Sequence, residues 1–482
     1  MCKRTISRRK FLGQASCAAV GSTAFLSTAL NLGMINTVSA RPHIVGNSAD
    51  HKAIVCILLA GGCDTHNVLV PTGGSDVSGP YADYKATRGP SLTLDRDNPA
   101  DLLPLKDVDY HVHAGMSLVQ AMFDSKDLSF VSNIGTLIEP IQSIADYESG
   151  VKKLPLGLYS HSDQIMQWQT SIPQTRTAVG VGGRMADLLQ DMNSIPEVSM
   201  NISLSGKNQF QAGNQYNEYS IKRNVTADNV GFDGFPEWWS NRGLMTDLRN
   251  TVINNMAEKQ YANIFEKTIG SLTSQTQGSI EIMRTALANL VPLGTPFNPK
   301  NNLALDLKKI AELISVQNFL GANRQIFFVT YGGWDHHDNV IANQARMLPI
   351  VSEALSQFNA SMKDIGKHED VLTFTISDFA RTLTSNGNGS DHGWGGNQII
   401  MGGPIKGGEI FGTYPSLALN SDYNVSERGR MIPTTSVDEF YAEVALWFGA
   451  SPNDLDYILP NLGNFYSGSG LPSNYSPIGM FA

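Results

Sequence analysis

The chain has 482 residues and a formal net charge of −9, with 41% hydrophobic and 16% charged residues. This composition is typical of a globular protein that is long enough to bury a large core. Because nucleic-acid binding needs clustered Lys and Arg, the acidic balance argues against a nucleic-acid partner. No apolar stretch after the N-terminal segment is long enough to span a bilayer, so we expect no membrane span in the mature chain.

The first 40 residues have the pattern of an export signal. Residues 7–12 read SRRKFL, a twin arginine followed by Phe-Leu, which is typical of twin-arginine translocation signals. A mildly apolar run over 18–32 follows, and residues 38–40 (VSA) form a small-x-small cleavage site. We therefore predict that residues 1–40 are removed, that the twin-arginine translocation machinery is a partner, and that the mature protein is periplasmic or extracellular.

Short apolar runs alternate with helix-like periodic segments along the rest of the chain. The strand-like runs are 53–60, 128–131, 325–330, 371–376 and 398–401. The helix-like segments are 305–320, 346–365 and 439–448. This alternation predicts an α/β fold, with a doubly wound, mostly parallel sheet flanked by helices, over a single domain at 41–482.

The segment at about 208–299 differs from its surroundings. It carries a polar, helix-like stretch over 246–277 and few strand signals. We predict a mostly helical insertion there. In the mature chain the cysteines are Cys56 and Cys63, which lie on one extended run, so their Cα atoms are expected to be too far apart for a disulfide.

Polar clusters follow the predicted strands at their carboxyl ends, where open α/β sheets bind ligands. They read GGCDTHN at 61–67, YGGWDHHD at 331–338, SDFAR at 377–381 and NGNGSDHGWGG at 386–396. Carboxylates gathered at one sheet edge repel each other unless a cation lies between them. Asp with His suits zinc, manganese or iron, whereas oxygen ligands alone suit magnesium or calcium.

Each residue also has a simpler interpretation when taken alone. Asp64 is most simply a helix cap. Ser160-His161 pairs a hydroxyl with an imidazole, as at the start of many nucleophilic sites, but Ser160 also fits the cap of a following helix. The recurrence of Asp and His at several strand ends is what favours a metal site.

These motifs resemble those of the DUF1501 family, which belongs to the alkaline-phosphatase/sulfatase-like superfamily. The matching segments are Gly61-Gly62-Cys63-Asp64-Thr65-His66-Asn67 with Val70-Pro71, Ser160-His161, Gly333-Trp334-Asp335-His336-His337, Ser377-Asp378-Phe379-Ala380-Arg381-Thr382, Asn386 through His392-Gly393, Gly402-Gly403, Lys406-Gly407-Gly408 and Gly412. The resemblance extends over essentially the whole mature chain, from Lys52 to about Leu462, and is weakest in the insertion.

The resemblance implies an alkaline-phosphatase-like sheet with one or two divalent metals at its carboxyl edge. Zinc is the first expectation, and manganese, calcium and magnesium remain open. By this resemblance Asp64 and Asp378 share one metal, and Asp335, His337 and His392 hold the other. Ser160 is then the nucleophile, and Arg381 clamps an anionic oxygen.

The chain also departs from the superfamily pattern. Phe379 stands where its phosphatases often have a ligand His, and the residues that could fill this gap are His161, His336 and Asp391. Cys63 lacks the Cys-x-Pro-x-Arg signature of a sulfatase. Two functions remain open. One is an exported metal-dependent hydrolase of phosphate or sulfate esters on an anionic small molecule or glycan. The other is a non-catalytic exported binding or surface protein that retains one structural metal.

Overall fold

The computed structural model describes residues 50–227, 230, 251, 278–466 and 475–482. The chain divides into two units, Met1–Ile44 and Val45–Ala482, and every described residue belongs to the second. The predicted export signal over 1–40 lies outside the described residues. No helix of the described part is both long and apolar enough to cross a membrane.

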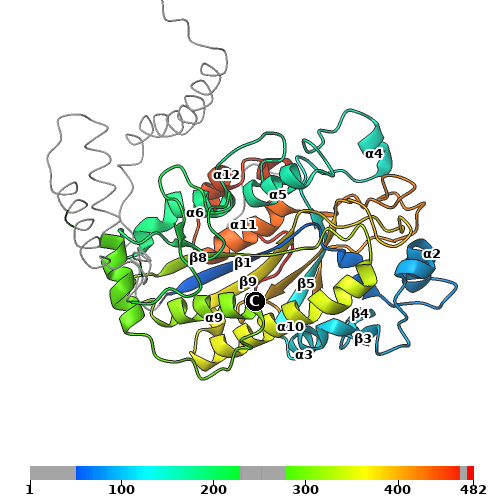
Figure 1. Ribbon diagram of the computed structural model, residues 1–482. Helices are drawn as coiled ribbons and strands as arrows, with labels where there is room; N and C mark the ends of the chain where they lie inside the picture. Colours follow the sequence, from blue (N-terminus) through cyan, green and yellow to red (C-terminus); the bar gives the residue numbers. More distant parts are fainter. Residues whose placement is uncertain (1–49, 228–229, 231–250, 252–277, 467–474) are drawn as a thin grey trace, which may run out of the picture. The chain divides into compact units, whose positions relative to one another are not determined.

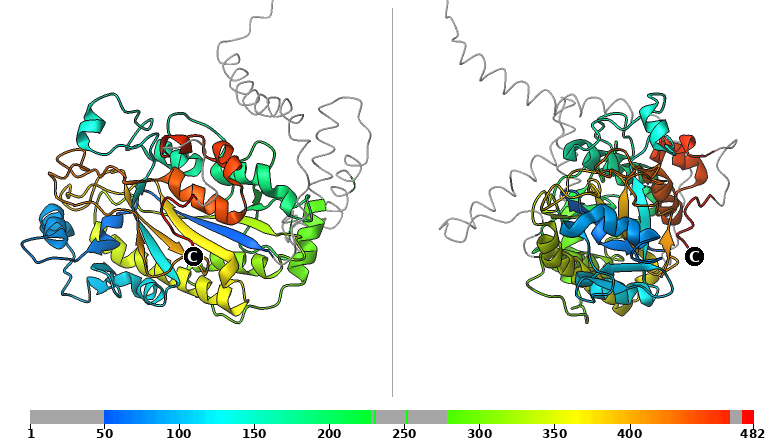
Figure 2. Two further views of the ribbon diagram at one scale, coloured as in Figure 1. Left: turned by 180° about the vertical axis from the view of Figure 1, so that it is seen from behind. Right: turned by 90° about the vertical axis from the view of Figure 1, so that its right-hand side faces the viewer.

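The core of the fold is one large sheet with β1 near its centre (Figures 1 and 2). The strand order is β11 (Ile410–Phe411), β5 (Leu128–Gly135), β10 (Gly396–Met401), β9 (Val371–Ser377), β1 (Lys52–Ala60), β8 (Arg324–Gly332), β6 (Asn201–Ser203) and β7 (Tyr219–Ser220), with β12 (Thr435–Ser436) also paired to β5. Only β10 is antiparallel to its neighbours in this sheet, so the predicted mostly parallel sheet is confirmed.

Alternate residues of β1 supply the two halves of the core. Val55 and Ile57 lie in one hydrophobic cluster, and Ile54 and Cys56 lie in the other. This is the period of two expected for a strand that is covered on both faces. The register is set by parallel pairing, which places Val55 opposite Phe327 of β8 and Thr373 of β9.

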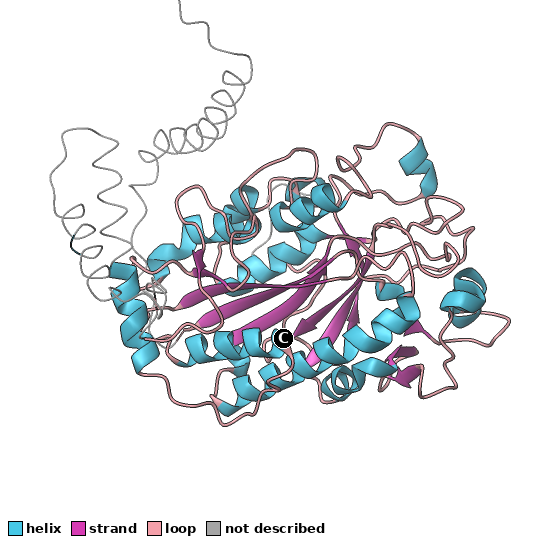
Figure 3. Ribbon diagram, in the orientation of Figure 1, coloured by secondary structure: helices cyan, strands magenta, loops and turns pink. Residues whose placement is uncertain are grey.

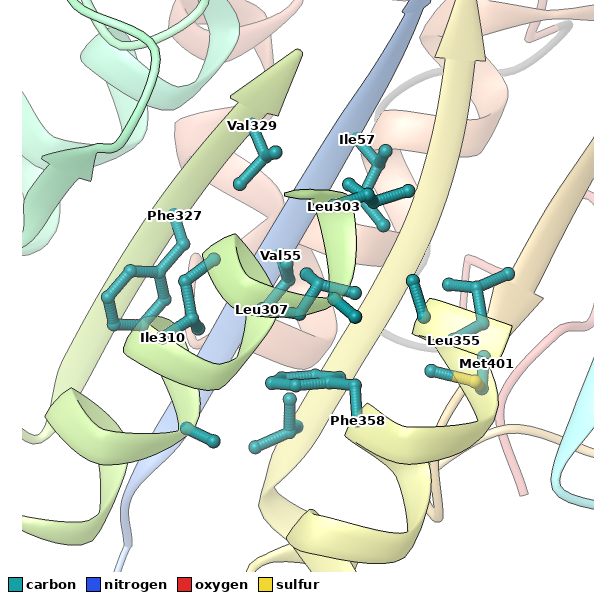
Figure 4. Close-up of a cluster of buried hydrophobic side chains, with 14 of the residues drawn as sticks. Val55, Ile57, Leu303, Leu307, Ile310, Phe327, Val329, Leu355, Phe358 and Met401 are labelled. Atoms are coloured by element: carbon teal, nitrogen blue, oxygen red, sulfur yellow. The ribbon is translucent and has the colours of Figure 1, made fainter. Parts of the chain in front are cut away.

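Helices cover both faces of the sheet (Figure 3). The cluster on one face includes residues of α3 (Ser117–Asp124), α9 (Asn302–Ser315) and α10 (Val340–Asp364). Figure 4 shows Leu307 and Ile310 of α9 and Phe358 of α10 beside Val55 and Phe327. The cluster on the other face includes residues of α5 (His161–Thr170), α6 (Val181–Leu189), α11 (Val437–Phe448) and α12 (Leu455–Ile458). The predicted doubly wound arrangement is thus confirmed.

A smaller unit between β1 and β5 was absent from the sequence-based prediction. It contains a three-stranded antiparallel sheet of β2 (Leu69–Pro71), β4 (Tyr110–His113) and β3 (Leu102–Pro104), together with α2 (Pro80–Leu92). Its strands have only three or four residues, too few to show a clear period. The unit is important for the site because α2 carries the buried Arg88.

The remaining elements are short. They are α4 (Ile144–Glu148) and the 3₁₀ turns η1 (Thr65–Asn67), η2 (Ala114–Met116), η3 (Gln190–Met192), η4 (His368–Asp370), η5 (Pro452–Asp454) and η6 (Leu462–Asn464). Of the predicted insertion at 208–299, the described parts hold β7 and a helix over residues 278–288. Most of the predicted helical stretch at 246–277 lies outside the described residues.

Candidate metal centre

Three imidazoles and one carboxylate converge at the carboxyl edge of the sheet. Asp335 Oδ1 lies 3.1 Å from His337 Nε2 and 3.5 Å from both His161 Nε2 and His392 Nε2. His337 Nε2 and His392 Nε2 are 2.9 Å apart. Of the predicted residues, the structure therefore brings together Asp335, His337, His392 and the additional candidate His161.

Segments that are distant in sequence deliver these four side chains. Asp335 and His337 follow β8, and His392 lies in the loop between β9 and β10. His161 is the first residue of α5. The end of β1 passes so close to the Asp335 loop that a Cβ on Gly61 would lie 2.6 Å from the Asp335 backbone nitrogen. Glycine at 61, with φ at +119°, is therefore required for this approach.

The other ring nitrogen of each imidazole is already committed. His161 Nδ1 donates to Asp378 Oδ2 at 2.6 Å, His337 Nδ1 donates to Asp391 Oδ1 at 3.0 Å, and His392 Nδ1 donates to the Tyr159 carbonyl at 2.7 Å. A carboxylate or carbonyl oxygen can only accept, so each Nδ1 carries a hydrogen. In a neutral imidazole the lone pair is then on Nε2, the atom that faces the shared point. Carboxylates and carbonyls orient metal-binding histidines in this way.

The charge state of the centre suits a cation. Burial raises the pKa of Asp335, but the hydrogen bond and charge of Arg381, with smaller contributions from His337 and His161, lower it below its ordinary value overall. Burial lowers the pKa of His392, and the neighbouring His161, Arg381 and His337 lower it further, against the bond to the Tyr159 carbonyl, which raises it. The carboxylate is therefore ionised and this imidazole neutral near pH 7.

The donor set fits a divalent transition metal. Two ligands bound tetrahedrally at zinc distances lie about 3.3 Å apart. The distances from Asp335 Oδ1 to the three Nε2 atoms and the distance between His337 Nε2 and His392 Nε2 are 2.9–3.5 Å, and ligand atoms of His161, Asp335 and His392 all lie within 4.8 Å of one another. His161 Nε2 is buried and has no hydrogen-bond partner, as expected of an atom that is free to bind a cation. The side chains of Asp335 and His337 are 48% and 45% exposed, so the centre is open to solvent, unlike a closed structural zinc site.

Asp378 and Asp391 accept hydrogen bonds from Nδ1 of His161 and His337, the ring nitrogens that face away from the shared point. Asp378 is buried, and its second oxygen, Oδ1, accepts from the Gly61 backbone nitrogen at 2.9 Å. Asp391 accepts from His337 and Asn386 and is also paired with Arg428. Their hydrogen bonds place both carboxylates as orienting groups for His161 and His337, whereas the resemblance makes Asp378 a direct metal ligand.

Asp64 forms a buried ion pair with Arg88. It is fully buried, and Oδ2 lies 2.6 Å from Arg88 Nη2 and accepts from Ser390 Oγ at 3.1 Å. Burial raises the pKa of Asp64, but Arg88, together with His66 and Ser390, lowers it overall. Among the contacts of the described residues, none joins the Asp64 carboxylate to Asp378. The expected sharing of one metal by Asp64 and Asp378 stays a prediction, and Asp64 is paired with the Arg88 guanidinium in this structure.

Arg381 is the residue expected to clamp an anion. Its side chain is fully buried. It donates to the carbonyls of Gly62 at 2.7 Å, Gly61 at 2.7 Å, Ser390 at 3.1 Å and Trp334 at 3.2 Å, and to Asp335 Oδ1. These bonds hold three loops together and fix the Asp335 carboxylate. The guanidinium is thus bonded to backbone carbonyls and to Asp335, and the expected role of Arg381 as an anion clamp stays a prediction.

The other predicted residues lie outside the convergent group. Ser160 is the residue before α5, and its Oγ lies 3.2 Å from Ser162 Oγ, on the same helix. No contact of the described residues joins Ser160 Oγ to Asp335. His336 is buried beside Trp334, and both its ring nitrogens lack hydrogen-bond partners. Burial lowers its pKa, so it is neutral near pH 7.

Both described cysteines are buried and unpaired, as the spacing argument predicted. Burial raises the pKa of the Cys63 thiol well above its ordinary value, so it is not a ready nucleophile.

Sequence reasoning missed Arg88. It follows Asp64 by 24 residues on a helix of the small unit, and no local motif indicates that it folds back onto Asp64.

Comparison with known proteins gives one family match. Residues 300–455 match the family described as "Protein of unknown function (DUF1501)", a segment that contains Asp335, His337, Asp378, Arg381 and His392. No curated protein matches the chain.

Solved structures give distant matches. Ps i-CgsB, in complex with k-i-k-neocarrahexaose, is 12% identical, with 86% of this chain and 77% of that chain covered and a TM-score of 0.34. The PsFucS1 sulfatase from Pseudoalteromonas sp. is 11% identical, with 83% and 68% covered and a TM-score of 0.32. The lipoteichoic acid synthase LtaP from Listeria monocytogenes is 9% identical, with 85% and 81% covered and a TM-score of 0.30. Similarities this low establish neither a shared fold nor a shared activity.

Proposed function

We propose that the chain is a metal-dependent hydrolase of phosphate or sulfate esters, from the geometry of the centre and from the match of residues 300–455 to the DUF1501 family model. The observation that carries the proposal is the convergence of three imidazole Nε2 atoms on Asp335 Oδ1, with every Nδ1 already bonded elsewhere. The residues that would hold the ion are His161, Asp335, His337 and His392. One ion, with zinc as the first choice, fits this set.

A bound divalent ion supplies Lewis-acid polarisation of an ester oxygen and lowers the pKa of a bound water. The chain contributes the fixed surroundings for this chemistry. Arg381 holds the Asp335 carboxylate in place, and Asp378 and Asp391 fix the ring orientation of His161 and His337. The solvent-open position of Asp335 and His337 gives a substrate access, which favours a catalytic over a purely structural centre.

Ser160 remains the candidate nucleophile. It immediately precedes His161, so a small change at the start of α5 would move its hydroxyl relative to the centre. In this structure its side chain contacts Ser162 Oγ at 3.2 Å and hydrogen-bonds to Asp163, both in the first turn of α5. The substrate would be an anionic small molecule or glycan ester outside the cytoplasm, reached after twin-arginine export.

One observation favours the second candidate function, an exported binding protein with one structural metal. In the described part of the chain, neither Ser160 Oγ nor the buried Cys63 thiol contacts the four converging side chains. In this alternative the centre fixes the fold locally while another surface binds the partner. Ester hydrolysis by the metal-loaded wild type separates the two functions. Within the hydrolase, a Ser160→Ala variant separates a serine nucleophile from water activated at the centre, which needs no serine.

The experiment is metal analysis of the exported protein together with assays on aryl phosphate and aryl sulfate esters. We expect about one ion per chain in the wild type and loss of both metal and hydrolysis in Asp335→Ala/His337→Ala, because two of the four donors are removed. The matched control is His368→Ala/Asp370→Ala, a His/Asp pair in η4, just before the amino end of β9, which should leave both intact. A wild type without metal contradicts the proposal, as does unchanged hydrolysis in the first variant.

A further inference from the structure

Arg430 bonds to the backbone of His392, a residue of the candidate metal centre. Its Nε donates to the His392 carbonyl at 3.0 Å, and its guanidinium carbon lies 4.0 Å from the centre of the Tyr159 ring. Tyr159 and His392 are themselves joined, because His392 Nδ1 donates to the Tyr159 carbonyl. Arg430 is thus held by a hydrogen bond and by stacking on an aromatic ring, next to a residue of the centre.

The charge of Arg430 is not balanced by a neighbouring carboxylate. Arg428, two residues earlier, is paired with Asp391. In the described part of the chain, no ion pair is made by Arg430, and no protein acceptor faces its two terminal nitrogens, Nη1 and Nη2. The residue is half-buried.

The contrast with the two other arginines near the strand ends is informative. Arg88 and Arg381 are fully buried, and their terminal nitrogens bond to carboxylates and backbone carbonyls. Those two side chains serve the fold. Arg430 is oriented by Nε alone and keeps its fork of donors free, which is the arrangement that recognises planar or tetrahedral anions with two parallel hydrogen bonds.

We propose that Arg430 is the residue that binds the oxyanion group of the substrate beside the metal centre. The inference rests on the proposed function and refines it, since it moves anion recognition from Arg381 to Arg430 and requires a ligand with at least two free oxygens on phosphorus or sulfur. Arg430 acts here in binding and specificity. Its stacking on Tyr159 keeps the guanidinium ordered, so little side-chain freedom is lost when the anion binds.

Calorimetric titration of the metal-loaded protein with inorganic phosphate, and separately with sulfate, tests the inference. We expect Arg430→Met to weaken binding of the preferred anion about tenfold or more, the effect of losing charged hydrogen bonds. Arg430→Lys, which keeps the charge without the fork, should lie between Met and the wild type. Arg284→Met removes an exposed arginine paired with Glu281 and controls for net charge. Metal content should match the wild type in all three.

The outcomes separate this inference from the proposed function. Phosphate and sulfate affinities in Arg430→Met equal to those of the wild type overturn the inference, and if metal and hydrolysis persist the proposed function stands. A wild type that binds neither anion also overturns it. Anion binding that depends on Arg430 in a protein without ester hydrolysis supports the inference and contradicts the hydrolase. Arg430→Lys guards against a folding defect in the Met variant, since it retains the contact with Tyr159.

Discussion

Two clusters of Asp and His lie at the carboxyl ends of neighbouring strands, and they are built in opposite ways. After β8, Asp335 faces three imidazole Nε2 atoms and is half-exposed. After β1, Asp64 is fully buried and faces the guanidinium of Arg88. Both carboxylates pair with an arginine, Asp335 with Arg381 and Asp64 with Arg88. The clusters differ in their other neighbours and in exposure: Asp335 also faces three imidazole Nε2 atoms and is open to solvent, whereas Asp64 is buried.

The two clusters also have different energetic consequences. A buried ion pair such as Asp64–Arg88 is sensitive to loss of one partner, because the remaining charge is left without compensation. The Asp335 carboxylate is exposed to solvent, so the protein loses only a moderate amount of folding free energy when no metal is bound there. The first cluster should therefore respond to mutation through stability, and the second through metal affinity.

The largest expected effect separates the clusters directly. Arg88→Met should lower the free energy of unfolding by about 3–5 kcal/mol, because Asp64 is left as an uncompensated buried charge. Chemical denaturation of the folded variant measures this loss. The double variant Asp64→Asn/Arg88→Met should recover part of it, since no buried charge remains. Unchanged stability would contradict this account of the ion pair. A second ion that the wild type binds and Asp64→Asn loses would show that Asp64 is a metal ligand.

An intermediate effect, on metal affinity, is expected for Asp378, which bonds to Nδ1 of His161. Asp378→Asn should weaken metal binding about 10–100-fold while leaving one ion bound at saturation, since it removes the partner that orients His161. Competition with a chromophoric chelator gives the dissociation constant. Asp370→Asn, just before the opposite end of β9, is the matched control. If saturating metal fails to restore one ion per chain, Asp378 is a direct ligand rather than an orienting residue.

The smallest effect concerns a histidine whose lone pair is already used. His113 Nδ1 accepts from the Gly115 backbone nitrogen at 2.9 Å, and burial lowers its pKa from 6.5 to about 4, against a small opposing effect of Asp101. The unfolded chain therefore takes up a proton first as pH falls below 6.5, and stability decreases towards pH 4. We expect about 1–2 kcal/mol of this loss between pH 7 and pH 5.

The control for that titration removes the ionisable group but keeps the bond to the Gly115 backbone nitrogen, by which His113 caps the amino end of η2. His113→Asn places a side-chain oxygen where it can accept from Gly115, so stability at pH 7 should change little. Its loss of stability between pH 7 and pH 5 should be shallower than that of the wild type by the amount assigned to His113. Parallel pH profiles of the two proteins would show that another group is responsible. Unlike the metal-facing imidazoles, His113 should be indifferent to added zinc.

Much of the fold follows from local sequence features. The apolar run at 53–60 and its parallel neighbours identify strands buried on both faces, and the polar segments after them identify the edge where the centre forms. Asp335, His337 and His392 were expected together, and the structure places them together. The short strands of the small unit escaped prediction because three residues show no periodicity.

The contacts of Asp64 and Arg381 that the sequence did not indicate have a common physical origin. Whether Asp64 binds a metal depends on Arg88, and whether Arg381 is free depends on the carbonyls of Gly61 and Gly62. Both facts are set by tertiary packing between segments that no local motif connects. The same holds for His161, which a helix start far along the chain brings to Asp335.

Titration of metal-free protein with zinc, followed by X-ray absorption of the loaded form, tests the central claim most directly. One ion per chain is predicted, with three imidazole nitrogens and carboxylate or water oxygen in its first shell, and with stoichiometry unaffected by Asp64→Asn. Two ions per chain, of which one is lost in Asp64→Asn, would contradict the claim and support the two-metal arrangement that the sequence resemblance implies.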